Sequence, residues 1–166
     1  MIINLKKYSV LFCIIFLFFE AMLFPEEQAK SNINLGATAD NAQYENAAGF
    51  YRLKEYSKAL ELFTEYLETN LNGLHRKEAY KNIAAIYFDR FDYIKSVKVY
   101  KSLYEEFSNS EEGIEGLFMA GICYQKMGFM DKAKETFKLL IEQHPSSNFA
   151  YQSRVKLDLI EILEKG

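Results

Sequence analysis

Five positions recur three times in this chain at one fixed spacing, and this repetition restricts the possible folds more than any other feature. The recurring residues are Ala47, Phe50, Tyr56, Ala59 and Phe63, then Ala84, Tyr87, Tyr93, Ser96 and Tyr100, then Gly121, Tyr124, Met130, Ala133 and Phe137. Within each copy the offsets are three, six, three and four residues, and successive copies are displaced by 37 residues. A period of this length indicates one supersecondary unit stacked on itself.

The spacing inside each copy predicts two antiparallel helices joined by a short polar turn. A small residue stands three before an aromatic one in the first helix, and a second small residue stands in the second helix. Small side chains let two helix backbones approach closely, and aromatic rings fill the volume beside them. The predicted packing residues are Ala47, Ala59, Ala84, Ser96, Gly121 and Ala133. We expect an all-α chain with helices over 39–53, 56–70, 75–90, 93–107, 111–127, 130–143 and 148–164.

This pattern resembles the tetratricopeptide repeat, a helix–turn–helix unit of 34 residues. The resemblance is densest in the third copy, where the matching residues are Gly121, Tyr124, Gly128, Ala133, Phe137 and Pro145. Leu71 and Ser108 replace the closing proline in the other copies, and Gln43, Tyr80 and Leu117 replace the motif's tryptophan. The resemblance implies a helical-hairpin solenoid over 40–166, with repeats at 40–73, 77–110 and 114–147 and a C-terminal capping helix at 148–164.

The N-terminus is the most apolar part of the chain. Residues 8–19 form an unbroken apolar run that follows Lys6 and Lys7 and ends at Glu20. A basic start and about a dozen apolar residues predict a secretory signal peptide over 1–24, with an uncleaved signal anchor as the alternative. Cys13 is a poor lipidation site because Phe12 directly precedes it. Residues 25–39 lack apolar periodicity and are predicted to form a flexible tether.

Composition argues against several classes of function. The net charge of −3 does not suit a nucleic-acid-binding protein. Two cysteines and two histidines are too few for a Cys/His zinc site, and no glycine-rich phosphate loop is present. His144 precedes Pro145 at a predicted helix end, and Cys123 has the setting of a buried thiol. We therefore expect no enzymatic activity, no metal and no cofactor.

The resemblance also implies where a partner would bind. In tetratricopeptide arrays, particular first-helix positions line the concave face, and here they include Tyr44, Ala48, Tyr51, Arg52, Lys81, Phe88, Asp89, Phe118, Ile122 and Gln125. Apolar anchors among polar groups suit a groove for a peptide or a helix of a protein partner. The alternative is that the last helix or a neighbouring subunit covers these residues. The absence of a Lys/Arg cluster argues against the type of groove that clamps a terminal carboxylate.

Two envelope families share the export signal and the short array. The chain resembles the periplasmic coordinators of cell division that act beside the Tol-Pal system, and the tetratricopeptide lipoproteins of outer-membrane β-barrel assembly. It lacks the coiled-coil segment of the first family and the anchor cysteine of the second. The resemblance implies an exported, periplasmic or envelope-associated scaffold whose membrane contact is limited to the N-terminal segment. A self-associating module and an accessory subunit of an envelope machine remain as alternatives, and the sequence leaves the oligomeric state open.

Overall fold

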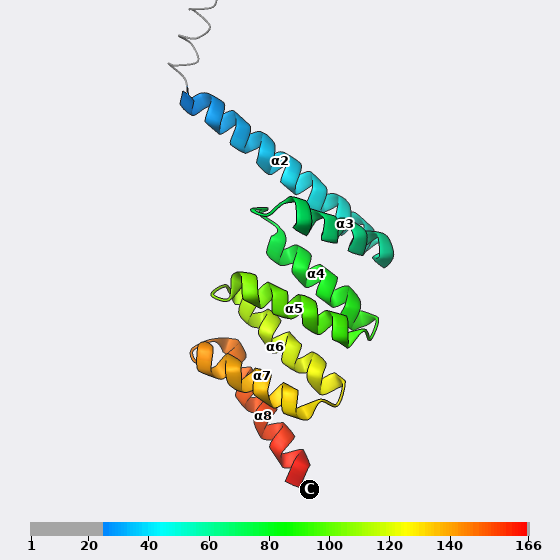
Figure 1. Cartoon of the computed structure of the whole chain (residues 1–166), viewed down its shortest axis with the longest axis vertical. Coiled ribbons are helices and arrows are strands. Elements are labelled where there is room, and N and C mark those ends of the chain that lie inside the picture. Colours follow the sequence, from blue (N-terminus) through cyan, green and yellow to red (C-terminus); the bar gives the residue numbers. More distant parts are fainter. Residues whose placement is uncertain (1–24, 166) are drawn as a thin grey trace, which may run out of the picture. The chain divides into compact units, whose positions relative to one another are not determined.

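The computed structural model describes the backbone of residues 25–165 and their side chains from residue 36 on. Within this range the chain forms seven helices and no strand, so the predicted all-α class is confirmed (Figure 1). The helices are α2 (Pro25–Arg52), α3 (Tyr56–Thr69), α4 (Arg76–Asp89), α5 (Tyr93–Phe107), α6 (Glu111–Lys126), α7 (Met130–Gln143) and α8 (Asn148–Lys165). The chain divides after Ala39 into two units, and the second, Asp40–Gly166, holds the repeats.

The three turns inside the hairpins have the same backbone conformation. Lys54, Phe91 and Gly128 occupy equivalent positions, and their φ angles are 61°, 60° and 76°. The N–H of the following residue donates to the carbonyl five residues back, as from Glu55 to Phe50 at 3.0 Å and from Phe129 to Tyr124 at 2.9 Å. This is the Schellman ending of a helix, which favours glycine at the residue with positive φ. The chain therefore reverses direction identically in each repeat, although only the third turn has glycine there.

The small residues lie where the helices of each hairpin meet. Ala47, Ala59, Ala84, Ser96 and Ala133 have no exposed surface. At Gly121 a Cβ atom would lie 2.5 Å from Cε1 of Phe137, so α6 and α7 are in contact there without room for a side chain. The buried Ser96 hydroxyl donates a hydrogen bond to the carbonyl of Ala84 at 3.0 Å. These contacts keep paired backbones close, as ridge-and-groove packing requires.

Buried polar side chains join successive repeats. Asp40 is 7% exposed, and it accepts hydrogen bonds from the Tyr66 hydroxyl at 2.6 Å and the Leu74 N–H at 2.9 Å. Arg76 is equally buried, and it pairs with both carboxylate oxygens of Glu106 on α5. Its remaining nitrogen donates to the Leu67 and Asn70 carbonyls at the end of α3. A cation is favourable there because helix C-termini carry partial negative charge.

The last helix packs on the third repeat. Its N-terminus is capped by Ser147, whose Oγ accepts from the Ala150 N–H at 3.0 Å. Ala150, Ser153 and Ile160 are the buried residues of α8. Figure 1 shows α8 crossing α7 at the end of the stack, where it also contacts α6. The predicted capping helix is therefore present, and it ends one residue later than expected.

The predicted tether over 25–39 is helical, because α2 begins at Pro25 and continues to Arg52. Proline suits the first position of a helix, because the N–H it lacks has no partner within the helix there. Gly36 costs only about 1 kcal/mol of helix propensity, so it does not interrupt the helix. The predicted signal segment, 1–24, lies outside the described residues. In the part of the chain that is described, no helix is both long and apolar enough to span a bilayer.

A candidate peptide-binding face

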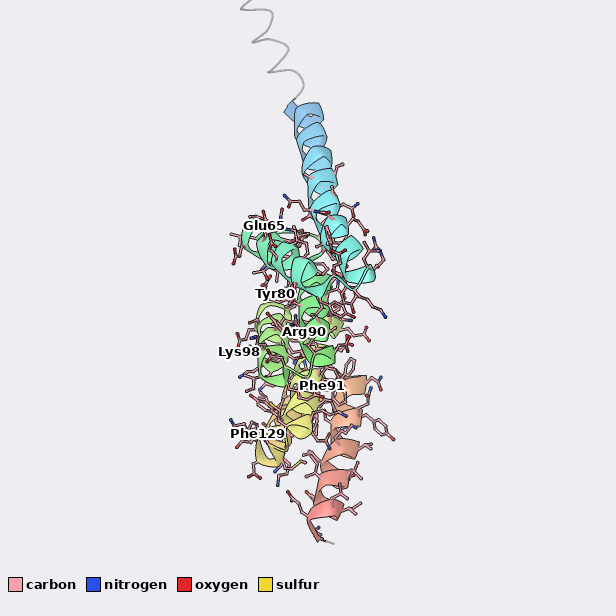
Figure 2. The ribbon with its side chains drawn as sticks, turned by 90° about the vertical axis from the view of Figure 1, so that its right-hand side faces the viewer. Glu65, Tyr80, Arg90, Phe91, Lys98 and Phe129 are labelled. Atoms are coloured by element: carbon pink, nitrogen blue, oxygen red, sulfur yellow. The ribbon has the colours of Figure 1, made fainter. Side chains whose placement is uncertain are left out.

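The first helices of the repeats form one side of the array, here called the inner face: α2 from Asp40 on, α4 and α6. Figure 2 shows the opposite side through Glu65 of α3 and Lys98 of α5, whereas α8 lies on the side of the inner face. Polar contacts connect neighbouring first helices. Asn82 donates to the Tyr44 hydroxyl at 3.3 Å, and Lys81 pairs with Glu115 at 2.6 Å. The inner face is therefore a continuous surface over the three repeats.

The last helix covers the inner face at the third repeat. Phe118 is only 7% exposed, and its ring lies 5.5 Å from that of Phe149 on α8 and 5.7 Å from that of Phe137. Ile122 is half-buried in the same apolar cluster. The sequence left open whether these residues form a groove or are covered, and at Phe118 the structure shows coverage by the last helix. A partner could reach Phe118 only by displacing α8.

Two predicted residues of the first repeat are engaged in packing. Ala48 is 6% exposed within the first core cluster. The Tyr44 ring stacks on His75 with centroids 4.4 Å apart, and burial raises the pKa of its hydroxyl. His75 in turn has its Nε2 3.1 Å from the Asn41 side-chain oxygen. These side chains join α2 to the start of α4 and leave little surface for a ligand.

The remaining predicted residues leave part of the inner face uncovered. We call Tyr51, Arg52, Phe88 and Asp89 the open segment. Tyr51 and Phe88 are half-buried, with ring contacts to Tyr56 at 5.9 Å and Tyr93 at 5.2 Å, while Arg52 and Asp89 are exposed. Burial raises the pKa of Tyr51, and the nearby carboxylate of Asp89 raises it further. Gln125, also predicted, is half-buried on α6.

Sequence reasoning assigned Tyr100 to the core, and the structure adds a polar role. Its side chain is 7% exposed. Burial raises the pKa of its hydroxyl, and the charges of Glu115 and Asp89 raise it further. Among the described residues this hydroxyl has no hydrogen-bond partner. A phenol hydroxyl without a protein partner can donate to a ligand carbonyl. The sequence did not predict a role for this hydroxyl, because the repeat motif requires only an aromatic ring at this position.

The groups that could perform chemistry are engaged in the fold. Burial raises the pKa of the Cys123 thiol, which lies 3.5 Å from Ser96 Oγ, so the nucleophilic thiolate is disfavoured. His144 Nε2 lies 3.0 Å from the Tyr104 hydroxyl at a helix end. No three His, Cys, Asp or Glu side chains gather as a metal site within the described residues. What this surface can offer is apolar and hydrogen-bonding contact.

Comparison with known proteins agrees with the assignment of the third repeat. Residues 115–147 match the tetratricopeptide repeat family model. Photosystem I assembly protein Ycf3 from Synechococcus sp. (strain CC9605) is 30% identical over 74 residues, which cover 45% of this chain and 41% of that protein. The Ycf3 of Prochlorococcus marinus is 25% identical over 116 residues, covering 61% and 65%. The chain therefore spans less than two thirds of the length of these relatives.

Solved structures show the same fold at low sequence identity. The N-terminal domain of stress-induced protein-1 (STI-1) from C. elegans has a TM-score of 0.58 at 17% identity, covering 71% of this chain and 94% of that one. The Sgt2 TPR domain from Aspergillus fumigatus has a TM-score of 0.57 at 19% identity, covering 77% and 83%. The second TPR domain of human RPAP3, solved in complex with an HSP70 peptide, has a TM-score of 0.53 at 15% identity, covering 74% and 98%. These likenesses show that the chain has the fold of a tetratricopeptide-repeat solenoid, built from stacked helical hairpins.

Proposed function

We propose that this protein is a non-catalytic adaptor that holds a peptide or helix of a protein partner against the open segment of the inner face. The observation that carries the proposal is the pair of half-buried rings, Tyr51 and Phe88, on consecutive first helices that α8 leaves uncovered. A half-exposed aromatic ring offers a large apolar contact at a small loss of conformational entropy. The RPAP3 domain, which shares the fold, was solved with a bound peptide.

The charges of the inner face favour an apolar anchor over an acidic chain terminus. Lys77 pairs with Glu112 at 3.0 Å, and Lys81 pairs with Glu115, so both lysines of α4 are neutralised. Arg52 lies 3.4 Å from Glu45, and Asp89 adds a carboxylate directly after Phe88. A bound segment would place apolar side chains on Tyr51 and Phe88, with the Tyr100 hydroxyl available to a backbone carbonyl.

We propose that the protein acts in the bacterial cell envelope. The support is the basic start and the apolar run of residues 8–19, which has the form of an export signal or a signal anchor. Export would place the repeats outside the cytoplasm, either free after cleavage or held at the membrane by residues 1–24. Fractionation of cells, with mass spectrometry of the mature N-terminus, tests this part; a cytosolic chain that retains Met1 would contradict it.

The binding proposal is tested by photocrosslinking at single positions of the full chain in its own cells. A photoreactive phenylalanine analogue at Phe88 or at Tyr51 is expected to give the same crosslinked partner. The same analogue at Lys98, exposed on the outer side, is the matched control and should not give that partner. Tyr51→Ala in the chain labelled at Phe88 should reduce the crosslink at least tenfold with unchanged helix content. Equal yields from Phe88 and Lys98 would contradict the assignment to the inner face.

A further inference from the structure

The last helix has an apolar stripe on its outer surface. Tyr151, Val155, Leu159, Ile162 and Leu163 are 65%, 48%, 45%, 67% and 69% exposed, and we call them the α8 stripe. Four of them are spaced at intervals of four residues, and Ile162 lies beside the last. The stripe points away from Ala150, Ser153 and Ile160, which pack α8 on the third repeat. These five side chains therefore lie mostly outside the contact between α8 and the third repeat.

A capping helix needs only its inner side to be apolar. The end of a solenoid is normally polar on its outer side, since that side faces water. A continuous apolar stripe on a helix surface marks a contact with another helix. The elements packed against α8 are α7 and α6, and both lie on its buried side. Within the described residues, the stripe has no partner.

We propose that a second copy of this chain covers the α8 stripe, with the two α8 helices crossing antiparallel about a two-fold axis near Leu157. A two-fold contact requires a patch that is complementary to itself. An antiparallel pair centred there places Tyr151 of one copy opposite Leu163 of the other, and Val155 opposite Leu159, so the four residues spaced at intervals of four meet one another. Ile162 comes opposite Gln152, at the edge of the contact. Intervals of four residues form the ridges that interdigitate when helices cross at about −50°.

The charges beside the stripe are also complementary to themselves. Arg154 and Asp158 lie on the same border, one turn apart. Arg154 has only a long contact of 3.4 Å to the Pro145 carbonyl, and Asp158 has no ion-pair partner among the described residues. The other two acidic residues of this part of α8 do have partners: Glu164 pairs with Lys134 at 2.8 Å, and Glu161 pairs with Lys165 at 3.8 Å. In the antiparallel pair, Arg154 of each copy comes alongside Asp158 of the other.

Co-purification of two differently tagged full-length copies, expressed together and extracted in detergent, tests the pairing. The wild-type copies are expected to co-purify. Leu159→Glu should lower the recovery of the second copy at least tenfold, because it places a carboxylate in the stripe. Leu139→Glu on α7 is the matched control, since Leu139 is a leucine of similar exposure, 42%, outside the stripe. Far-UV circular dichroism should show unchanged helix content in both variants. Failure of the wild-type copies to co-purify, or equal recovery for both variants, overturns the proposal.

The antiparallel arrangement is tested separately by cysteine crosslinking in a chain carrying Cys13→Ser and Cys123→Ser. One copy carrying Val155→Cys and the other carrying Leu159→Cys should form a disulfide faster than two copies that both carry Leu159→Cys. A parallel pair would reverse this order and overturn the geometry. Arg154→Asp should weaken co-purification, and Arg154→Asp with Asp158→Arg should restore it. If the double variant is no better than the single one, the charge pairing is wrong.

Discussion

Single residues in this protein depart from the repeat pattern at the turns, where a positive φ angle favours glycine. Phe91 has a φ of 60° at the position where the third repeat has Gly128, and its ring is 78% exposed. A side chain with positive φ costs roughly 1–2 kcal/mol because Cβ crowds the following carbonyl. The ring recovers little of this by burial, since among the described residues its ring contact is with Tyr93 at 6.2 Å. Phe91 is therefore tolerated by the fold but does not stabilise it.

Phe91→Gly is expected to raise the free energy of unfolding by about 0.5–1 kcal/mol, because relief at positive φ exceeds the entropy that glycine adds to the unfolded chain. Lys54→Gly, with a φ of 61° at the equivalent turn, should act in the same direction. Urea denaturation followed by circular dichroism measures both. Gly128→Ala is the opposite control and should destabilise; a destabilising Phe91→Gly would show that the exposed ring contributes to the fold.

The pair of Arg76 and Glu106 should make stability depend on acidity. Hydrogen bonding to Arg76 and to the Tyr80 hydroxyl lowers the pKa of Glu106 from its ordinary value. A lowered folded-state pKa stabilises the fold above the unfolded-state pKa of about 4.3, and this stabilisation is lost as pH falls through the lower folded-state value. Glu106→Gln should therefore flatten the dependence of stability on pH in this range and should cost roughly 2 kcal/mol at neutral pH.

The exposed pair of Lys58 and Glu61, 2.7 Å apart on α3, provides the comparison for this experiment. Glu61→Gln should change stability by less than about 0.5 kcal/mol, because surface pairs contribute little. Denaturation midpoints measured from neutral pH down to acid pH give the slope for each variant. Equal slopes for Glu106→Gln and the wild type would show that the Arg76 pair does not couple folding to protons.

At the scale of helices, the same substitution should have opposite effects in two first helices. Gly121 of α6 is in contact with the Phe137 ring of α7, whereas a Cβ at Gly49 of α2 would meet only the end of Arg52, at 4.0 Å. What differs between the two glycines is therefore the neighbouring helix and not the local conformation. The repeat pattern identified Gly121 as a packing residue, and Gly49 lies outside the pattern.

Gly121→Ala is expected to destabilise by roughly 1–3 kcal/mol, because the rigid Phe137 ring must move. Gly49→Ala should stabilise by about 1 kcal/mol through helix propensity alone. Phe137→Leu should reduce the cost of Gly121→Ala when the two are combined, which a double-mutant cycle of urea-denaturation free energies would detect. Additive effects at these two positions would contradict direct contact between α6 and α7 there.

At the scale of the repeat array, α8 acts as more than an end cap. It buries Phe118 through Phe149, and it presents the α8 stripe on its other side. In a stack where each unit contacts mainly its neighbours, the loss of contacts at one end should destabilise the adjacent repeat most. The stability of this protein should therefore vary along its length.

Replacing Phe149 by Ala should show this gradient. The substitution uncovers Phe118 and should cost roughly 1.5–2 kcal/mol, because Phe149 is half-buried and loses only part of the contact of a core phenylalanine. Hydrogen exchange of backbone amides should rise in α6 and α7 and stay unchanged in α3 and α4. Tyr151→Ala, on the exposed side of α8, is the matched aromatic control, measured below the concentration at which copies associate. A uniform rise along the chain would mean that the array unfolds as one cooperative unit.

Much of the helical core follows from the repeat pattern, because small and aromatic residues at fixed offsets have only one way to pack as stacked hairpins. The helix bounds from α3 to α8 agree with the prediction within one residue. The prediction was wrong for 25–39, which is helical without an apolar period because more than half of its residues are the good helix formers Glu, Gln, Ala, Lys and Leu. It could not anticipate Arg76, Asp40 or the Tyr100 hydroxyl, because their partners are distant in the sequence and their motif positions carry no polar requirement.

The sequence by itself determined the repeat unit, the order of the helices and the surface that each first helix contributes to the inner face. Periodicity specifies which side of a helix is buried, since side-chain direction follows from position along the chain. Only the tertiary structure decided which part of the inner face is open, because that depends on where α8 packs after the last repeat. The placement of α8 is a contact between elements and leaves no period in the sequence, so Phe118 and Phe88 look alike there but differ in the fold.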